Sequence, residues 1–165
     1  MKVFKIKVRL LGVKNTGKTC FNNNNKFQKG EFQEISHYIK TINNIKFKIQ
    51  ILELDWFELS LKSLNFDSSA IMLFYDSMDK DSFEKIKRFY FSISDYKKIF
   101  FLVRSKYDIK SNIYNESDIV SDEEALEFAD ENNIIFAHFS SIEKYETGID
   151  YLLNKIITEF LKLKI

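Results

Sequence analysis

Residues 12–19 read G-x-x-x-x-G-K-T and directly follow a run in which apolar and charged side chains alternate. The apolar members of residues 4–10 alternate with three cations, Lys5, Lys7 and Arg9, which is typical of a strand with one apolar face. Gly12 and Gly17 are two of only four glycines in the 165 residues. Glycines at this spacing after a strand predict a tight loop whose backbone N–H groups can surround a phosphate before a helix begins.

The polar side chains of this loop have predicted roles. We expect Lys18 to reach the β and γ oxygens of a nucleotide, and Thr19 to offer its hydroxyl to a Mg²⁺ ion that keeps most of its water shell. The alternative interpretation is a glycine-bearing turn without a ligand. Cys20 is more often a small packing residue than a nucleophile in such a position, and we assign it no chemistry.

The rest of the chain alternates predicted strands and helices. Strands are expected at 39–42, 45–51, 70–75, 99–103 and 134–139, with a hairpin turn at Asn43-Asn44. Helices are expected from near Asp79 to Ile93, over 125–130 after a capping box at Ser121, and over 149–161. This order predicts an α/β fold, a three-layer sandwich in which helices cover both faces of a mostly parallel six-stranded sheet, as one domain over residues 1–165.

Composition narrows the function classes. An apolar fraction of 45% excludes disorder, and a net charge of +1 gives no global field that would favour nucleic acid or an anionic membrane. One cysteine and the absence of a signal-peptide stretch predict a reducing, cytoplasmic location. The sequence has neither an apolar run that could span a membrane nor a prenylatable cysteine in Leu163-Lys164-Ile165. We therefore expect no direct membrane anchor in this chain.

Motifs at further positions resemble those of the Ras-like small GTPases, the Rab branch most closely. Residues 48–52 look like the strand before the D-T-A-G-Q-E motif, and Tyr75-Asp76 followed by Asp81-Ser82-Phe83 is similar to the start of the third helix in Rab proteins. Residues 102–108 fall where the family carries N-K-x-D, and residues 139–142 fall where it carries T-S-A-K. The resemblance implies the P-loop fold of a small GTPase G domain.

The resemblance also implies a ligand and its binding residues. In N-K-x-D the aspartate selects guanine, and here Lys106 and Asp108 are retained whereas Ser105 replaces the asparagine. Phe32 is a candidate for the aromatic residue near the base, with packing on the sheet as the alternative. The expected cofactors are GTP or GDP with Mg²⁺, the expected metal ligands are Thr19 and Glu53, and the expected nucleotide-binding residues are Gly12, Val13, Lys14, Asn15, Thr16, Gly17, Lys18, Thr19, Cys20, Phe32, Ser105, Lys106, Asp108, Ser140, Ser141 and Ile142.

The switch motifs depart from the family pattern. Glu53 takes the place of the D-T-A-G-Q-E aspartate, Trp56 that of the glycine and Phe57 that of the glutamine. A register two residues later would use Asp55 instead, but it breaks the strand alignment. Phe57 cannot orient a water, so we assign no catalytic residue and expect slow GTP hydrolysis. Trp56 and Phe57 also fit a hydrophobic anchor for the second helix.

Several polar residues keep more than one interpretation. Ser36 and Thr41 are weak candidates for the switch I threonine, and His37 and His138 are expected to be ordinary surface or loop residues. Lys5, Lys7 and Arg9 place charges on one face of an inner strand. Pairing with Glu53, Asp55 or helix carboxylates would explain them, as would an unusually polar partner face.

The motifs together favour a Rab-like guanine-nucleotide switch in vesicle traffic or signalling, with protein effectors or exchange factors as partners and membrane contact only through them. A pseudo-GTPase scaffold that binds partners constitutively around Trp56, Phe57 and Leu59 is the alternative. A nucleotide kinase is disfavoured because the chain has only three arginines. The absence of C-terminal cysteines implies a trimmed chain, a further domain or recruitment by other proteins, and a homo-oligomer is left open.

Overall fold

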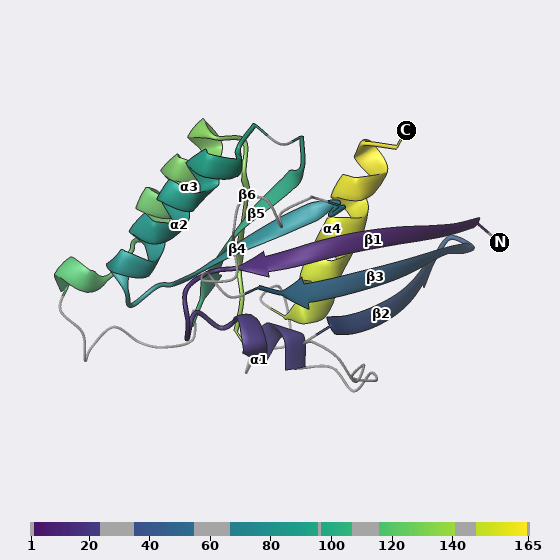
Figure 1. Cartoon of the computed structure of the whole chain (residues 1–165), viewed down its shortest axis with the longest axis horizontal. Coiled ribbons are helices and arrows are strands. Elements are labelled where there is room, and N and C mark those ends of the chain that lie inside the picture. Colours follow the sequence, from purple (N-terminus) through teal and green to yellow (C-terminus); the bar gives the residue numbers. More distant parts are fainter. Residues whose placement is uncertain are drawn as a thin grey trace.

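A computed structural model describes residues 2–23, 35–54, 67–95, 97–106, 116–140 and 148–164 (Figure 1). The strands are β1 (Lys2–Leu11), β2 (Ile35–Ile42), β3 (Ile45–Glu53), β4 (Ala70–Asp76), β5 (Ile99–Ser105) and β6 (Ile135–His138). The helices are α1 (Lys18–Asn23), α2 (Lys80–Ile93), α3 (Asp122–Glu131) and α4 (Ile149–Lys162), with a short 3-10 helix, η3 (Glu116–Asp118).

The strands form one six-stranded sheet in the order β2-β3-β1-β4-β5-β6. Only β2 runs antiparallel to its neighbour, and every other pair is parallel. Parallel neighbours require crossover connections, which the helices supply. The predicted α/β fold with a mostly parallel six-stranded sheet is therefore confirmed.

The β2–β3 hairpin closes through a two-residue turn, as predicted. Asn43 and Asn44 both have positive φ, 49° and 61°, and Ile42 pairs with Ile45 across them. Two left-handed residues suit the right-handed twist of a hairpin, and asparagine tolerates that conformation. β2 begins at Ile35, earlier than the predicted residue 39, because its backbone pairs with β3 even where apolar residues do not alternate.

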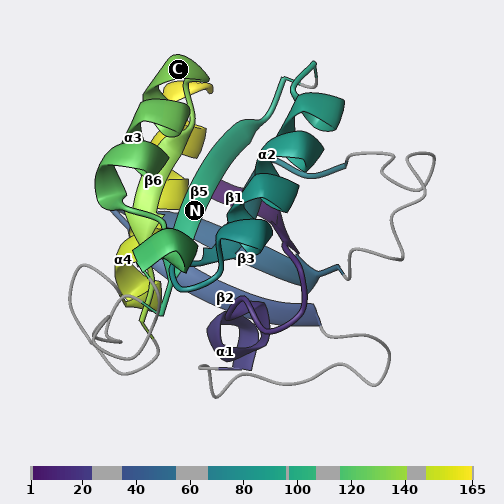
Figure 2. The same ribbon diagram turned by 90° about the vertical axis from the view of Figure 1, so that its left-hand side faces the viewer.

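Helices cover both faces of the sheet with separate cores. On one face, α4 and Phe21 of α1 pack against the even-numbered apolar residues of β1 and the odd-numbered ones of β3. On the other face, α2 and α3 pack against β4, β5 and Ile134. Figure 2 shows α2 and α3 over the β4–β5–β6 half of the sheet. None of the helices in the described part is long and apolar enough to cross a membrane.

Side-chain caps fix where α2 and α3 start. Asp79 accepts a hydrogen bond from the backbone N–H of Ser82, and Ser121 accepts one from that of Glu124. α3 therefore begins at Asp122, three residues before the predicted Ala125, because the first helical residue directly follows the cap.

Candidate nucleotide-binding site

The predicted phosphate loop lies where the order of the sheet reverses. β1 is flanked by β3 on one side and β4 on the other, so the chain leaves β1 toward one half of the sheet and returns to fill the other. In open parallel sheets, ligands bind at the carboxyl ends of the strands at such a point. Gly12 to Thr19 connect the carboxyl end of β1 to α1 at that position.

The loop backbone takes the unusual conformations that the sequence predicted. Asn15 and Gly17 have positive φ, 64° and 86°. At Gly12 an added β-carbon would lie only 2.5 Å from the carbonyl oxygen of Phe74, so β4 and the loop approach too closely for any side chain. The Thr16 hydroxyl donates to the carbonyl of Val13 (2.8 Å) and closes the turn.

Lys18 folds back into the loop. Its side chain is only 3% exposed, and Nζ donates to the carbonyl oxygens of Gly12 and Val13, each at 2.8 Å. An ammonium group keeps strong preference for anions, and a lysine is a common phosphate-binding residue in such loops. The loop therefore holds a positive charge at its centre.

An aromatic cluster holds α1 and the loop against the sheet. Phe21 is fully buried, and its ring lies 5.5 Å from that of Phe74 on β4 and 5.1 Å from that of Phe139 after β6 (centroid distances). Cys20, one residue earlier, is exposed and has a free thiol. The expectation of Cys20 as a packing residue is wrong because the buried position of this turn belongs to Phe21.

The two predicted metal ligands lie together. The Thr19 hydroxyl donates to Oε1 of Glu53 at 2.8 Å, joining the start of α1 to the end of β3. Hydroxyl and carboxylate oxygens are ligands that Mg²⁺ accepts, and Mg²⁺ usually adds water and substrate phosphate oxygens rather than more protein ligands. No group of three or more metal-binding side chains occurs among the described residues, which agrees with a site that depends on the nucleotide.

Ser105 brings the end of β5 against the phosphate loop. A β-carbon added at Gly17 would lie 3.0 Å from Cβ of Ser105. The Ser105 side chain is 1% exposed, and its hydroxyl donates to the carbonyl of Tyr75 at 2.8 Å. A residue distant in sequence thus forms the wall of the loop.

Lys106 is anchored by a carboxylate that sequence reasoning did not assign to the site. Lys106 has a positive φ of 56°, and its Nζ pairs with Oδ2 of Asp76 at the end of β4. The other oxygen of Asp76 accepts the backbone N–H of Met78 at 2.9 Å. The available signal was the parallel register, which sets Asp76 beside Ser105.

The structure also separates the weaker candidates. Ser36 pairs with Ile51 near the site, whereas Thr41 pairs with Lys46 at the opposite end of β3, roughly 23 Å from Glu53 at strand spacing. Thr41 is therefore excluded as the switch threonine. Ser140 is buried after β6. Phe32, Asp55, Trp56, Phe57, Leu59, Asp108, Ser141 and Ile142 lie outside the described residues.

A polar junction lies at the same ends of β5 and β6. Oδ1 of Asp122 accepts hydrogen bonds from Arg104 and from Nε2 of His138 (3.1 Å for the histidine). Burial would raise the pKa of Asp122, but these two partners outweigh it and lower the pKa. The expectation that His138 is an ordinary surface or loop residue is wrong because Asp122 holds it.

Comparison with known families decides the identity of this fold. The Ras family profile matches residues 7–162, which is nearly the whole chain. The chain belongs to the Ras family. Members of this family are small GTPases that bind guanine nucleotides, generally with Mg²⁺, and that act as switches with effectors and exchange factors. No curated protein matches the chain in sequence.

The described residues fit the ligand of a Ras-family protein. A cradle without side chains at Gly12 and Gly17, an ammonium inside it, and a hydroxyl and a carboxylate beside it supply the contacts that a nucleotide phosphate and Mg²⁺ require. Lys18 would hold phosphate oxygens, Thr19 and Glu53 would face the metal, and the bound ion would neutralise charge on the phosphates.

Proposed function

We propose that this chain is a Rab-like guanine-nucleotide switch that acts through protein partners in intracellular vesicle traffic or signalling and hydrolyses GTP weakly. The phosphate loop carries the proposal, because Lys18 is buried inside a loop whose wall is the residue at the N-K-x-D position, Ser105. The Rab-like finer assignment rests on sequence resemblance and on the start of α2.

The start of α2 supports the Rab-like assignment. In the segment that is similar to Rab proteins, the Ser82 hydroxyl donates to the carbonyl of Asp79 (2.7 Å) and accepts the backbone N–H of Asp76 (2.9 Å). Ser82 is fully buried, so this serine joins the end of β4 to α2. The Rab-like residues therefore form one connected turn next to Lys106.

Lys18→Ala tests the nucleotide site. We expect the variant to bind GDP and GTP about 10- to 100-fold more weakly, because a hydrogen bond to a charged group contributes about 1.5–3 kcal/mol. Lys14→Ala is the matched control, since Lys14 lies in the same loop with an exposed side chain. Titration with a fluorescent GDP analogue measures both.

Equal affinity in wild type, Lys18→Ala and Lys14→Ala would contradict the assignment and would favour the pseudo-GTPase scaffold. Competition by ATP against the same probe tests guanine selection through Asp108. We expect GTP to compete far better than ATP, and equal competition would remove guanine selectivity from the proposal.

Glu53→Gln tests the magnesium site. Loss of the carboxylate charge should raise the Mg²⁺ concentration needed to retain bound GDP by about threefold or more, because carboxylates are preferred Mg²⁺ ligands. Glu53→Asp keeps the charge and should change this requirement less. Release of fluorescent GDP across a Mg²⁺ titration gives the answer, and identical curves for both variants would move the metal site elsewhere, with Asp55 as the next candidate.

A further inference from the structure

Five cations share one face of two neighbouring strands. The alternation of β1 turns Lys5, Lys7 and Arg9 away from the core that holds Ile6, Val8 and Leu10. The parallel register then sets Lys5 beside Lys48 and Val3 beside Lys46 on β3. We call the surface formed by Lys5, Lys7, Arg9, Lys46 and Lys48 the basic face.

The basic face lies on the side of the sheet that α2 and α3 cover elsewhere. Those helices pack over β4 and β5, and from β1 and the end of β3 their core includes only Leu11 and Leu54 among the described residues. Side chains farther from β4 are open to solvent, and Lys5 and Lys48 are exposed. The basic face is therefore a surface and not an interior layer.

The charges of the basic face are poorly compensated within the described part of the chain. Asp67 pairs with Lys7 and lies near Arg9. Lys5, Lys46 and Lys48 make no ion pair or hydrogen bond with any other described residue. Glu53 does not reach them, because it lies on the opposite face and accepts the Thr19 hydroxyl. Like charges directly opposite on adjacent strands destabilise a sheet, so the Lys5–Lys48 pair is a cost to the fold.

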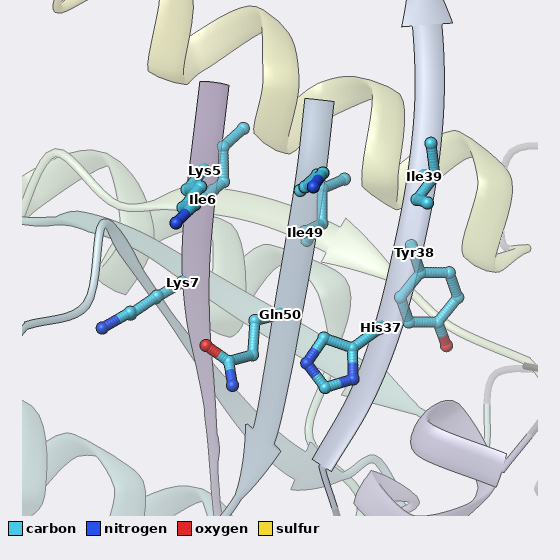
Figure 3. A pocket seen from close by; sticks show the side chains of 9 residues that line it. Lys5, Ile6, Lys7, His37, Tyr38, Ile39, Ile49 and Gln50 are labelled. Carbon is cyan, nitrogen blue, oxygen red and sulfur yellow. The ribbon is translucent and has the colours of Figure 1, made fainter. Parts of the chain in front are cut away.

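The basic face continues into a hollow of about 420 Å³ over β1, β3 and β2. Figure 3 shows Gln50 and His37 side by side on neighbouring strands, with Lys7 extending away from them and Tyr38 pointing to the other side of β2. Two apolar side chains border the surface, Val3 at 47% and Ile39 at 61% exposure. The described positions of this face include no phenylalanine, tyrosine or tryptophan.

We propose that the basic face docks an acidic, partly apolar segment of a partner protein. Alternate side chains of an extended segment repeat about every 6.6 Å, which is the spacing of the cations along β1. Carboxylates at those positions would meet the lysines, and apolar residues would cover Val3 and Ile39. The apolar margins favour a polypeptide, and the missing aromatic side chains disfavour single-stranded nucleic acid, whose bases stack on them.

A fluorescent peptide in which glutamate alternates with valine is the probe, and the same peptide with glutamine is its control. We expect saturable binding to the GDP-loaded protein at about 50 mM NaCl that is lost near 500 mM, because salt screens exposed charges. Fluorescence anisotropy measures it. Equal binding of the glutamine peptide would overturn the proposal.

The variant Lys5→Gln/Lys46→Gln/Lys48→Gln tests the surface. It should bind the acidic peptide at least about tenfold more weakly, because charged rims set such encounters. The control Arg88→Gln/Lys97→Gln/Lys164→Gln removes the same charge from exposed positions outside the basic face and should bind as wild type does. Equal weakening by both variants would mean a response to net charge and would overturn the proposal.

Two further measurements keep the result specific. The triple variant in the basic face should unfold at the same or a higher temperature, because a repulsive pair is relieved, and its GDP affinity should be unchanged, which separates this inference from the proposed function. A lower unfolding temperature would show that these lysines pair with the chain's own carboxylates. Tighter binding of a single-stranded oligonucleotide or of phosphatidylserine vesicles than of the peptide, or self-association at low salt in sedimentation, would each replace the proposed occupant.

Discussion

A missing β-carbon at Gly17 lets two parts of the nucleotide site touch. Its φ of 86° is strained for residues with a side chain, and Cβ of Ser105 occupies the space that a side chain would need. The serine hydroxyl, bonded to the Tyr75 carbonyl, ties β5 to β4 beneath the loop. Ser105 therefore has a structural task of its own at the position where relatives carry asparagine, and the looser base site expected from this change stays a prediction.

Tyr75 offers a test of packing next to this contact. Its ring is fully buried beside Phe83, and its hydroxyl has no hydrogen-bond partner within the described part of the chain. Burial raises the pKa of Tyr75 above its usual range, so the hydroxyl stays neutral. Tyr75→Phe should stabilise the fold by about 1 kcal/mol, because an unsatisfied buried polar group costs about 1–3 kcal/mol.

Tyr90→Phe is the matched control for Tyr75→Phe. The Tyr90 hydroxyl donates to the carbonyl of Asn132 at 3.1 Å, so its removal should destabilise rather than stabilise. Urea unfolding of the two variants measures the difference. Destabilisation by both changes would mean that Tyr75 has a partner that compensates its burial.

At the scale of elements, α3 is joined to two strands through Asp122. Arg104 extends from β5 and His138 from β6, and both bind the same carboxylate oxygen in the first turn of the helix. Ser105 follows Arg104 and Ser140 follows β6 by two residues, so this junction sets the two strand ends from which the base-binding segments leave.

The junction predicts a pH-dependent stability. Because the folded-state pKa of Asp122 is lowered, its contribution is present above the unfolded value near 3.9 and is lost as the pH falls through the folded pKa. Asp122→Asn should therefore cost about 1 kcal/mol or less at pH near 7, since solvent screens a part-exposed pair. The difference from wild type should disappear in stronger acid.

Glu123→Gln removes a charge from the same helical turn, where Glu123 is exposed, and controls for the helix dipole. Thermal unfolding across the acid range compares the three proteins. A constant gap between wild type and Asp122→Asn at every pH would show that the carboxylate charge is not what stabilises the junction.

The elements that the sequence predicted best are those whose signals are local. Alternation of residues 4–10 and the Asn43-Asn44 turn depend on neighbours along the chain, and β1 and the hairpin agree with them. Pairing of Lys5, Lys7 and Arg9 with Glu53 failed for a geometric reason. Residue parity in the parallel register puts Glu53 on the face of the sheet opposite these cations, and this register is a property of two strands that are distant in sequence.

At the scale of the whole molecule, the site exists because the sheet order brings the ends of β1, β3 and β5 together. The motifs predicted the residues of the phosphate loop, but not the Lys106–Asp76 pair or the contact between Gly17 and Ser105, which depend on the order β3-β1-β4-β5. The same order leaves the far half of one sheet face to the cations of β1 and β3. Nucleotide and partner surfaces therefore occupy different parts of one sheet.

Hydrolysis tests the whole assembly, because it needs a positioned water, Mg²⁺ and stabilisation of charge on the γ-phosphate together. Lys18, Thr19 and Glu53 supply groups for phosphate and metal. Phe57, at the position of the water-orienting glutamine, has neither donor nor acceptor, and Trp56 replaces the glycine whose N–H approaches the γ-phosphate.

We expect single-turnover GTP hydrolysis at saturating Mg²⁺ to proceed at or below about 10⁻⁴ per second, because intrinsic turnover in the family is slow even with the glutamine in place. Phe57→Gln alone should restore little of the rate, since Trp56 still obstructs closure. Trp56→Gly combined with Phe57→Gln should therefore raise the rate more than either single change does. A full rescue by Phe57→Gln would refute the account with two defects, and a wild-type rate equal to that of an ordinary small GTPase would show that another group, with Glu53 and Asp55 as the nearest carboxylates in sequence, orients the water.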